Sequence, residues 1–369
     1  MWRSLEALSR TRKMWSPAGS SAQESPQRPK SLKELAQYLK LDPSTVSVVL
    51  NNVPGRSISE PTRERIRAAA EMFSYQPNLL ARSFRQKDMR TIGILLPLVG
   101  EEYHAQVLSG IANELEENDY CYLIAQHHHR PERLKKYGEI LISRGVSGFV
   151  VIDTHLRYSV EVPVVAVAGH DDLPGVTNVM LDHDRAALHT MEHLYSLGHR
   201  TIAVIRGQPA SSDSKIRWRA TAKAAKKLGI EIPKRLVVGL TEDIPSPEHG
   251  YTVTSQLLKV SSAFTALVCF NDFAALGAIR ALEEARLSVP GDVSVVGFDD
   301  IRLSTFARPS ITTVRQPLSQ MGQTAARLLL QKMQGHNLPQ REYSVEPELI
   351  IRESTGRSRR NLMGRADRK

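Results

Sequence analysis

Two histidines and a glutamate stand at a spacing that could perform zinc chemistry. His189, Glu192 and His193 fit the pattern H-x-x-E-H, in which one helix places both histidines beside a Zn²⁺ ion. The same stretch fits an ordinary amphipathic helix, because Leu188 and Met191 would fall on its apolar face. We favour the amphipathic helix, so this motif does not predict an enzyme.

A trio of histidines, His127 to His129, could also bind a transition metal, but a lone trio without supporting partners is a weak signal. Cys121 and Cys269 lie in apolar runs without metal-ligand spacing. We expect both to be buried free thiols in a reducing compartment. The sequence holds no phosphate-binding loop, dinucleotide fingerprint or G-x-S-x-G nucleophile motif. It therefore predicts no metal, no cofactor and no enzymatic activity.

The distribution of charge points to a polyanionic partner. The chain has 369 residues and a net charge of +10. Residues 1–90 carry 16 Lys and Arg against 8 Asp and Glu, and residues 352–369 carry 7 against 2. A basic end beside a folded head suggests nucleic acid, although two solvated tails would look the same.

Composition bounds the class of protein. Hydrophobic residues make up 41 %, which is enough for a globular core of two or three domains. Apolar runs stay shorter than the roughly 18 residues of a membrane-spanning helix. The basic residues near the N-terminus are not followed by the apolar stretch of a secretory signal. We therefore expect a cytoplasmic protein without a membrane partner.

The chain divides into five segments by composition and periodicity. Residues 1–30 are rich in Pro, Ser and Arg and predict a disordered basic extension. The others are a helical headpiece at 31–76, a linker at 77–90, an alternating α/β core at 91–355 and a basic tail at 356–369.

The headpiece begins with two short helices that share a tight turn. Ser31 and Glu34 form a capping box at the start of the first helix. Asp42 and Pro43 mark the start of the second, as an N-cap acid followed by proline at the first helical position. Lys40 to Asp42 connect the two, which is the spacing of a helix-turn-helix. A third helix is expected from Ser59.

The core alternates strand-like and helical runs, which predicts parallel sheets built from βαβ units. Helices are expected between the strands, for example at 105–117 and 273–285. The predicted strands are 91–96, 120–125, 148–152, 162–167, 201–205, 236–238, 266–270 and 293–298.

Eight motifs occur in one order along residues 31–354. They are Ser31–Ala36, Ser44–Asn51, Ser59–Arg65, Tyr75–Ser83, Thr91–Leu95, Phe270–Gly277, Val289–Asp300 and Ile311–Pro317. Together they closely resemble the lactose/galactose repressor (LacI/GalR) family of transcriptional regulators. The resemblance implies an all-α helix-turn-helix headpiece, a hinge helix, and a two-lobed core like a periplasmic sugar-binding protein. It also implies a homodimer that reads a palindromic operator.

The resemblance assigns the second helix to the major groove of double-stranded DNA, with its first residues nearest the base edges. Val48 departs from the family, which often has Arg there, so we expect less dependence on guanine. The loop at 54–58 is about two residues longer than usual, and Arg56 would contact a phosphate. The residues implied to contact DNA in the headpiece are Pro43, Ser44, Thr45, Ser47, Val48, Asn51 and Arg56.

The stretch from Asn78 to Arg85 matches the hinge helix of the family. In relatives a leucine from this helix wedges between bases from the minor groove, and such wedges bend DNA. The matching residue is Phe84, followed by Arg85. We expect Asn78, Phe84 and Arg85 to contact DNA, although packing of Phe84 on the core is the simpler alternative.

The resemblance also implies an effector site between the two lobes. Arg217, Asn271 and Asp299 match family positions that suit a polyhydroxylated ligand, because they offer charge-assisted and two-way hydrogen bonds. Tyr103 and His104 replace an aromatic pair, and Gln126 and His127 end a strand, so we expect these four to line the mouth. Ala168 stands where the family often has Asp, which puts the usual sugar in doubt.

The sequence therefore predicts a DNA-binding transcriptional regulator, a repressor, controlled by a small molecule such as a sugar or related metabolite. The main alternative is a solute-binding protein of the periplasmic type, which would share the core but lack the headpiece. The tail from Gly356 has no heptad pattern, which favours a dimer over a tetramer. Neither the effector's identity nor whether it releases or promotes DNA binding follows from the sequence.

Overall fold

The computed structural model describes residues 29, 31–51, 56–75, 89–169, 173–241 and 246–359. The chain forms two compact units, a headpiece and a core, and each is described by itself. The predicted extension at 1–30 lies outside the described residues except for Pro29, as does the tail from 360 onward.

The headpiece is a cluster of three short helices. They are α1 (Leu32–Leu39), α2 (Pro43–Leu50) and α3 (Glu60–Met72). Their apolar faces meet in one small core, in which Leu35, Val46 and Ile66 are completely buried. Tyr38 of α1 stands edge-on to Phe73, with ring centroids 4.8 Å apart. The three expected helices are confirmed.

The turn between α1 and α2 is fixed by local hydrogen bonds. Ser31 caps α1 by accepting from the Glu34 N–H at 3.2 Å. Lys40 ends the helix in the left-handed region, with φ of 52°, and the Leu41 N–H donates back to the Ala36 carbonyl. Asp42 then caps α2 by accepting from the Ser44 N–H at 2.7 Å. The chain therefore reverses sharply enough for a helix-turn-helix.

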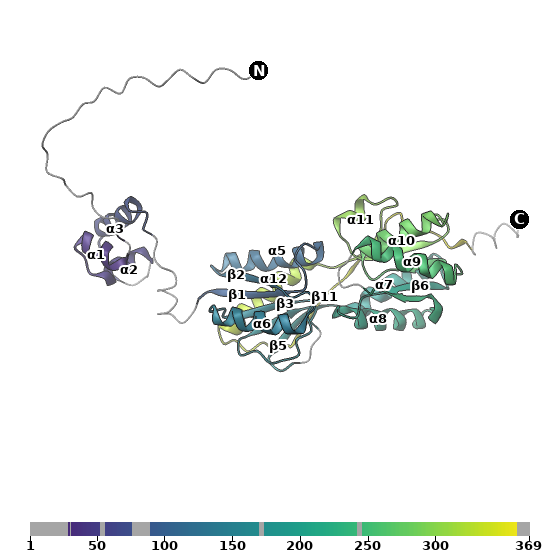
Figure 1. The fold of residues 1–369 in the computed structure, drawn as a ribbon, viewed down its shortest axis with the longest axis horizontal. Coiled ribbons are helices and arrows are strands. Elements are labelled where there is room, and N and C mark those ends of the chain that lie inside the picture. Colours follow the sequence, from purple (N-terminus) through teal and green to yellow (C-terminus); the bar gives the residue numbers. More distant parts are fainter. Residues whose placement is uncertain are drawn as a thin grey trace, which may run out of the picture. The chain divides into compact units, whose positions relative to one another are not determined.

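The core has two lobes, each built on a six-stranded sheet (Figure 1). The first sheet has the order β11-β5-β4-β3-β1-β2, and every pairing in it is parallel. One face packs against α5 (Glu102–Glu117) and α12 (Leu318–Met333), and the other packs against α6 (Pro131–Ser143). Its strands are β1 (Thr91–Leu96), β2 (Cys121–Gln126), β3 (Gly148–Ile152), β4 (Val164–Val167), β5 (Val176–Leu181) and β11 (Glu342–Val345).

The second sheet has the order β12-β10-β9-β8-β6-β7, and only its β10–β12 pair is antiparallel. The strands are β6 (Ile202–Arg206), β7 (Val237–Gly239), β8 (Ala266–Val268), β9 (Ser294–Asp299), β10 (Thr312–Arg315) and β12 (Glu348–Ile350). The helices of this lobe are α7 (His183–Ser196), α8 (Asp213–Lys227), α9 (Pro247–Val260), α10 (Asp272–Glu284) and α11 (Arg302–Phe306). A short 3₁₀ turn, Lys234–Leu236, precedes β7.

The chain passes between the lobes three times. It leaves the first lobe after β5, returns before α12, and leaves again between β11 and β12. Figure 1 shows α12, coloured yellow as part of the C-terminal region, lying among the elements of the first lobe. At the crossings, Leu181, Phe298 and Val314 form a small apolar cluster. The lobes are therefore joined by a three-stranded hinge.

Two expectations from the sequence need correction, one about the burial of a cysteine and one about which strands form. Cys121 is exposed, not buried, because β2 is the edge of its sheet and exposes most of its side chains. Cys269 is buried as expected, and burial raises the pKa of its thiol. The prediction also missed β5, β10, β11 and β12, of which β11 and β12 have only three or four residues.

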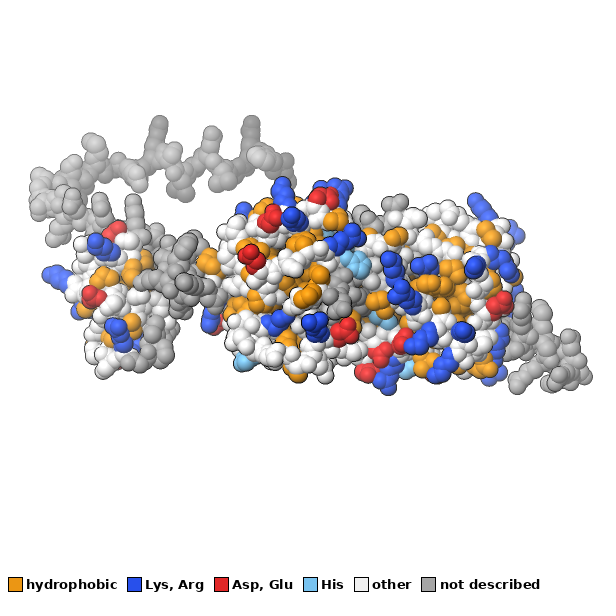
Figure 2. Space-filling view, turned by 90° about the horizontal axis from the view of Figure 1, so that it is seen from below, with side chains coloured by type: hydrophobic (Ala, Val, Ile, Leu, Met, Phe, Trp, Pro, Cys, Tyr) orange, Lys and Arg blue, Asp and Glu red, His pale blue; other side chains and the backbone are white. Residues whose placement is uncertain are grey.

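The surface of the core carries mixed charge. On the face drawn in Figure 2, basic side chains are scattered among apolar and neutral ones over both lobes. Within the described ranges, helices are all too short or too polar to span a bilayer.

Two glycines allow α5 and α12 to approach closely. A Cβ built on Gly110 would lie 1.9 Å from the Ser319 carbonyl oxygen, and one on Gly322 would lie 2.0 Å from the Val107 carbonyl oxygen. Backbone atoms cannot move aside as a flexible side chain can. These glycines therefore set the distance between the two helices.

Gly110→Ala should lower the free energy of unfolding of the core by about 1–3 kcal/mol, the usual cost of overpacking. Urea unfolding followed by circular dichroism would measure it. Gly239→Ala is the matched control, because a Cβ at Gly239 meets nothing within 4 Å. Equal midpoints for the two variants would contradict this account of the helix contact.

Candidate functional site

Helix α2 presents a small, mostly polar face to solvent. Val46 and Val49 point into the headpiece and are buried. The residues predicted to contact DNA lie on the remaining face, where two are exposed and the others half-buried. They are Pro43, Ser44, Thr45, Ser47, Val48 and Asn51.

Different hydrogen bonds position the residues at the two ends of this face of α2. Asn51 donates through Nδ2 to the Ser47 carbonyl at 2.7 Å and lies 3.2 Å from the Ser47 hydroxyl. At the other end, the Ser44 N–H donates to the Asp42 carboxylate at 2.7 Å and the Thr45 N–H donates to the Asp42 carbonyl at 3.0 Å. Hydroxyl side chains such as those of Ser44 and Thr45 can contact phosphates or base edges, and Val48 can meet an apolar group in the groove.

Arg56 is exposed and lies near the start of α2. Its charge helps to lower the pKa of Asp42, although hydrogen bonds from Ser44 contribute more. The Arg56 guanidinium is thus close to the first turn of the reading helix. Asn78, Phe84 and Arg85 lie outside the described residues, so the structure does not test the predicted hinge contacts.

In the core, a cleft lies between the lobes where strands of both sheets end. Five of the seven residues predicted to bind an effector line it, namely Tyr103, His104, Arg217, Asn271 and Asp299. Prediction from sequence missed the other lining residues, which are Glu101, His129, Asp153, Gln208, Ser211, Asp213, Phe270, Phe273 and Ile301. Asp153, Gln208 and Phe270 lie within two residues of the end of a strand, so the rule that ligands bind at the carboxyl ends of parallel strands could have found these three.

Arg217 is the buried cation of the cleft. Its guanidinium is held 2.6 Å from the Asp213 carboxylate and donates to the Phe270 carbonyl at 2.7 Å. The rings of Phe270 and Phe298 lie 4.5 and 3.7 Å from its carbon centre. Because aromatic rings and acceptors surround it, the side chain is fixed before any ligand arrives.

Asp299 faces Arg217 across 3.9 Å. It is 9 % exposed, and burial raises the pKa of its carboxyl well above the ordinary value. Gln316 donates to one of its oxygens at 2.7 Å. Its φ of 108° is a conformation that side chains rarely adopt, and such strain is concentrated at binding sites.

Asn271 is the N-cap of α10 and begins the wall opposite the first lobe. Its Oδ1 accepts from the Ala274 N–H at 2.9 Å. The cap fixes the side chain in one rotamer, with Oδ1 toward the helix. The remaining polar group of the side chain is the Nδ2 amide, a donor for a ligand.

Tyr103 and His104 form the first-lobe wall of the cleft. The Tyr103 hydroxyl is buried without a hydrogen-bond partner among the described residues, and burial raises its pKa well above 10. His104 is 4 % exposed, and its Nε2 likewise has no partner. Its Nδ1 lies 3.3 Å from a Glu101 carboxylate oxygen. Buried polar atoms without partners are costly, so a polar ligand would stabilise this wall.

Gln126 and His127 do not line the cleft. Gln126 accepts from the Val99 N–H at 2.9 Å and so anchors the loop after β1. His127 is buried, with Nε2 2.8 Å from the Thr154 hydroxyl, and burial lowers its pKa to about 3. A neutral imidazole in this position supports the segment after β3 instead of meeting a ligand.

Asp153 joins the two lobes across the cleft. From the end of β3 it accepts from the Ser212 N–H at 2.9 Å and from the Ser212 hydroxyl at 2.6 Å, and the Ser211 hydroxyl lies 3.2 Å away. A second contact between the lobes is made by Glu102, which accepts from the Arg302 N–H at 2.9 Å. These bonds hold the lobes together on both sides of the cleft.

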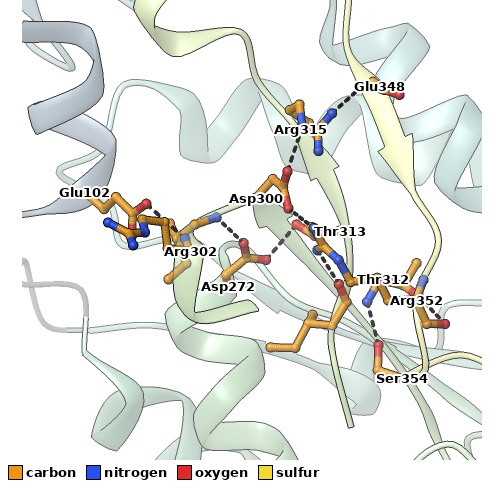
Figure 3. Close-up of polar contacts among 12 residues, drawn as sticks. Glu102, Asp272, Asp300, Arg302, Thr312, Thr313, Arg315, Glu348, Arg352 and Ser354 are labelled. Carbon is orange, nitrogen blue, oxygen red and sulfur yellow. Dashed lines mark hydrogen bonds and ion pairs between the residues drawn. The ribbon is translucent and has the colours of Figure 1, made fainter. Parts of the chain in front are cut away.

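A buried carboxylate, Asp272, fixes the loop that carries Asp299 (Figure 3). It accepts from the Thr313 hydroxyl at 2.6 Å and from the Ile301 N–H at 2.9 Å. A Cβ at Gly297 would lie 2.0 Å from its Oδ1, so only glycine fits beside it. Burial raises the pKa of Asp272 from its ordinary value of 3.8 to about 6.

Asp300 holds the other side of the same loop (Figure 3). Arg315 and Arg352 donate to its two oxygens at 2.7 and 2.6 Å. Arg315 also reaches Glu348 at 2.9 Å. Because Glu348 begins β12, directly after the last crossing between the lobes, Arg315 connects the loop to that crossing.

The histidine motifs do not assemble a metal site in the part of the chain that the structure describes. His193 lies on α7 and contacts the Thr355 hydroxyl at 2.9 Å, while Met191 and Leu194 are buried on the same helix. The interpretation as an amphipathic helix is therefore confirmed.

The cleft as it stands is nearly closed. Its cavity has a volume of about 40 Å³, enough for about three waters. A sugar-sized molecule would not fit between the lobes in this state. Binding therefore requires the lobes to separate, which breaks the bonds of Asp153 and Glu102.

Two family models match the chain. The model of bacterial regulatory proteins of the lacI family matches residues 31–78, which hold the headpiece. The model of a periplasmic binding protein-like domain matches residues 191–355.

Named relatives match over most of their length. The chain is 31 % identical over 340 residues to the HTH-type transcriptional repressor PurR of Haemophilus influenzae, covering 88 % of this chain and 98 % of PurR. It is 29 % identical over 333 residues to the repressor CytR of Escherichia coli, covering 88 % and 96 %. Both relatives are named as HTH-type transcriptional repressors.

Solved structures show the same fold. A lac repressor dimer bound to operator and the anti-inducer ONPF has a TM-score of 0.80 and 26 % identity, covering 89 % of this chain and 99 % of that one. The transcriptional regulator CelR in complex with cellobiose has a TM-score of 0.66 and 25 % identity, covering 88 % and 100 %.

Asp272→Asn should change how stability depends on pH. The folded protein keeps the Asp272 proton to about pH 6, whereas the unfolded chain loses it near pH 4. The wild-type side chain thus contributes stability below about pH 4 that is lost as pH rises through about 6. Relative to wild type, the variant should gain about 3 kcal/mol between these limits.

Urea unfolding of both proteins at several pH values would measure this gain. Asp119→Asn is the control, because Asp119 is exposed and its carboxylate lies 3.7 Å from Arg90. A stability difference for Asp272→Asn that stays constant across the range would show that the carboxyl is not titrating there.

Proposed function

Because this chain belongs to the LacI family of bacterial regulatory proteins and is a DNA-binding transcriptional regulator controlled by an effector, we propose that it represses transcription as a homodimer on a palindromic operator. The effector that we propose is a neutral, hydroxyl-rich small molecule, a sugar or a related metabolite. One observation carries the proposal. The same chain holds a reading helix with a polar outward face and a cleft with unsatisfied buried polar atoms.

The reading helix supports contacts of two kinds. Ser44 and Ser47 can donate to or accept from base edges, and Val48 can meet a thymine methyl. The Thr45 hydroxyl and the nearby Arg56 guanidinium suit the phosphate backbone. We propose that Asn78, Arg85 and a Phe84 wedge add contacts in the minor groove. Because contacts to phosphates release bound counterions, operator affinity should fall steeply as the salt concentration rises.

The charges in the cleft favour a neutral ligand over a phosphorylated one. Arg217 is already balanced by Asp213 at 2.6 Å. Glu101 and Asp153 add further carboxylates to the lining. An anionic ligand would meet more negative charge than positive, whereas hydroxyl groups can donate to the carboxylates and accept from the guanidinium.

Exposed apolar side chains support the dimer. On the unpaired edge of the first sheet, Tyr122, Leu123 and Ile124 are each exposed by 38–39 %. In the second lobe, Leu303 and Phe306 of α11 are 51 and 77 % exposed. Proteins cover such edges and patches with partners. We propose that two copies pair through these surfaces about a two-fold axis, so that two headpieces meet two half-sites.

A solute-binding protein without DNA function is the alternative. Such a protein would account for the core and the cleft, but it would not account for the helix-turn-helix headpiece. The regulator accounts for both units, and we place its action in the cytoplasm, where bacterial DNA lies. Ligand and operator would then alter each other's affinity by the same factor, through opening or closing of the lobes.

Selection of bound duplexes from a random DNA pool should enrich one palindrome. The selection is run with full-length protein at about 150 mM salt, near physiological ionic strength. Val48→Arg should shift the preference toward guanine at one position in each half-site, because Arg binds guanine bidentately. Val260→Arg, an equally large change at an exposed site on the core, should leave it unchanged. Absence of enrichment, with or without added metabolites, would refute the proposed operator binding.

Arg217→Gln should uncouple the operator from the effector while leaving operator affinity in the ligand-free state within about threefold. The readout is operator affinity with and without a pool of neutral sugars and nucleosides. Removing a charged hydrogen-bond donor from a buried ligand typically costs more than tenfold in ligand affinity. Arg280→Gln is the control, since Arg280 is exposed and pairs with Glu284 on its own helix. A variant that responds like wild type would exclude Arg217 from the effector site.

A further inference from the structure

One connection in the first lobe lacks the helix that parallel strands usually require. Strand β1 leads to β2 through α5, and β2 leads to β3 through α6. Between β3 and β4, residues 153–163 form an irregular segment, although parallel neighbours are normally joined by a helical crossover. The face of the sheet that carries α6 is therefore incompletely covered by helix in this region.

A large cavity lies at that place. Its volume is about 550 Å³, within the range of small-molecule sites and far above the volume of the cleft between the lobes. The walls are apolar and come from α6, from strands β1, β3 and β4, and from the irregular segment. The apolar lining residues are Leu95, Ile142, Phe149, Val151, Leu156, Val160 and Val164.

Polar groups are few and stand at defined points of the lining. Lys135 and Glu139 of α6 carry opposite charges, and Glu161 comes from the segment. The Tyr158 hydroxyl is buried with no hydrogen-bond partner among the described residues. A Cβ on Gly138 would lie 3.3 Å from this hydroxyl, so glycine leaves room for it.

The Tyr158 hydroxyl can donate a hydrogen bond, but no acceptor among the described residues lies within reach. Burial, and then the charge of Glu139, raise its pKa to about 12, so the proton stays on the oxygen at physiological pH. A buried hydroxyl without a partner lowers the stability of the fold, because it has lost its hydrogen bond to water. An acceptor placed in the cavity would remove that cost.

We propose that this cavity is a second ligand site, which binds a neutral and largely apolar molecule carrying one hydrogen-bond acceptor, such as an aromatic ketone or ester. Its walls match an apolar ring system in size, and Tyr158 supplies the polar contact that orients it. With Lys135, Glu139 and Glu161, the lining carries one net negative charge, which disfavours an anion, and its apolar walls favour a neutral ligand over a cation.

A ligand bound in this cavity would affect the cleft between the lobes through Asp153. The irregular segment begins at Asp153, whose carboxylate accepts hydrogen bonds from Ser211 and Ser212 of the second lobe. A molecule packed under the segment would order it and so bias the contact between the lobes. The second site would thereby modulate the same opening that the effector controls.

The test uses Prodan, a neutral naphthalene ketone whose fluorescence shifts to the blue in apolar surroundings. Titration of the full-length protein should give saturable, blue-shifted binding of about one dye per chain. Val160→Trp, which fills the cavity, should weaken binding at least tenfold. Val260→Trp, the same change at an exposed site of the second lobe, should not. Equal binding by both variants, or no saturable binding to wild type, would overturn the proposal.

Two further measurements guard against a variant that fails to fold. Tyr158→Phe keeps the ring and removes the donor, so the dye emission should shift further to the blue. In the wild-type protein, hydrogen exchange should slow on addition of Prodan in residues 153–163 and in α6. Protection confined to other regions, such as the exposed strand β2, would place the dye elsewhere and refute the site.

Discussion

The buried guanidinium of Arg217 is the interaction on which the effector cleft depends. It joins α8 to the chain after β8 through the Phe270 carbonyl, it balances the charge of Asp213, and it faces Asp299 across 3.9 Å. Removing a charge from water is expensive unless partners surround it. Here aromatic rings and acceptors do so from several elements at once. The polar groups of the cleft are consequently preorganised, which lowers the entropy cost of binding a ligand.

The three-stranded hinge links the geometry of the effector cleft to the arrangement of the two lobes. Because the chain crosses between the lobes three times, neither lobe can move freely of the other. The loop of Asp299 and Asp300 is bonded to Arg315 and Arg352, and Arg315 ends β10 directly before the second crossing. A change of contact at the cleft therefore becomes a change in the angle between the lobes, which is how packed proteins convert small shifts into large ones.

The sequence predicted the headpiece and much of the core for clear physical reasons. Capping residues such as Ser31 and Asp42 fix helix starts locally, and apolar periodicity shows the buried faces. The strands that escaped prediction are short and take their place through contacts distant in sequence, as β11 does beside β5. Cys121 was misjudged because an apolar run does not reveal whether a strand lies at the centre or the edge of its sheet.

The candidate site was predictable to a similar degree. Arg217, Asn271 and Asp299 were located by their motifs, and all three line the cleft. Asp153 was missed because its role arises only when the two lobes meet. Conversely, His127 follows a strand as a ligand-binding residue would, but its ring turns inward to Thr154. Position along a strand predicts the edge on which a residue lies, not the direction of its side chain.

The path of the chain also has a consequence for synthesis on the ribosome. The headpiece uses only residues near the N-terminus and can fold as soon as it emerges. The first lobe cannot, because α12 and β11 supply part of its core and are made after most of the second lobe. At about 5–20 residues per second, the half-built first lobe waits on the order of ten seconds or more with its apolar surface uncovered. Chaperones that shield nascent chains would therefore act chiefly on the first lobe.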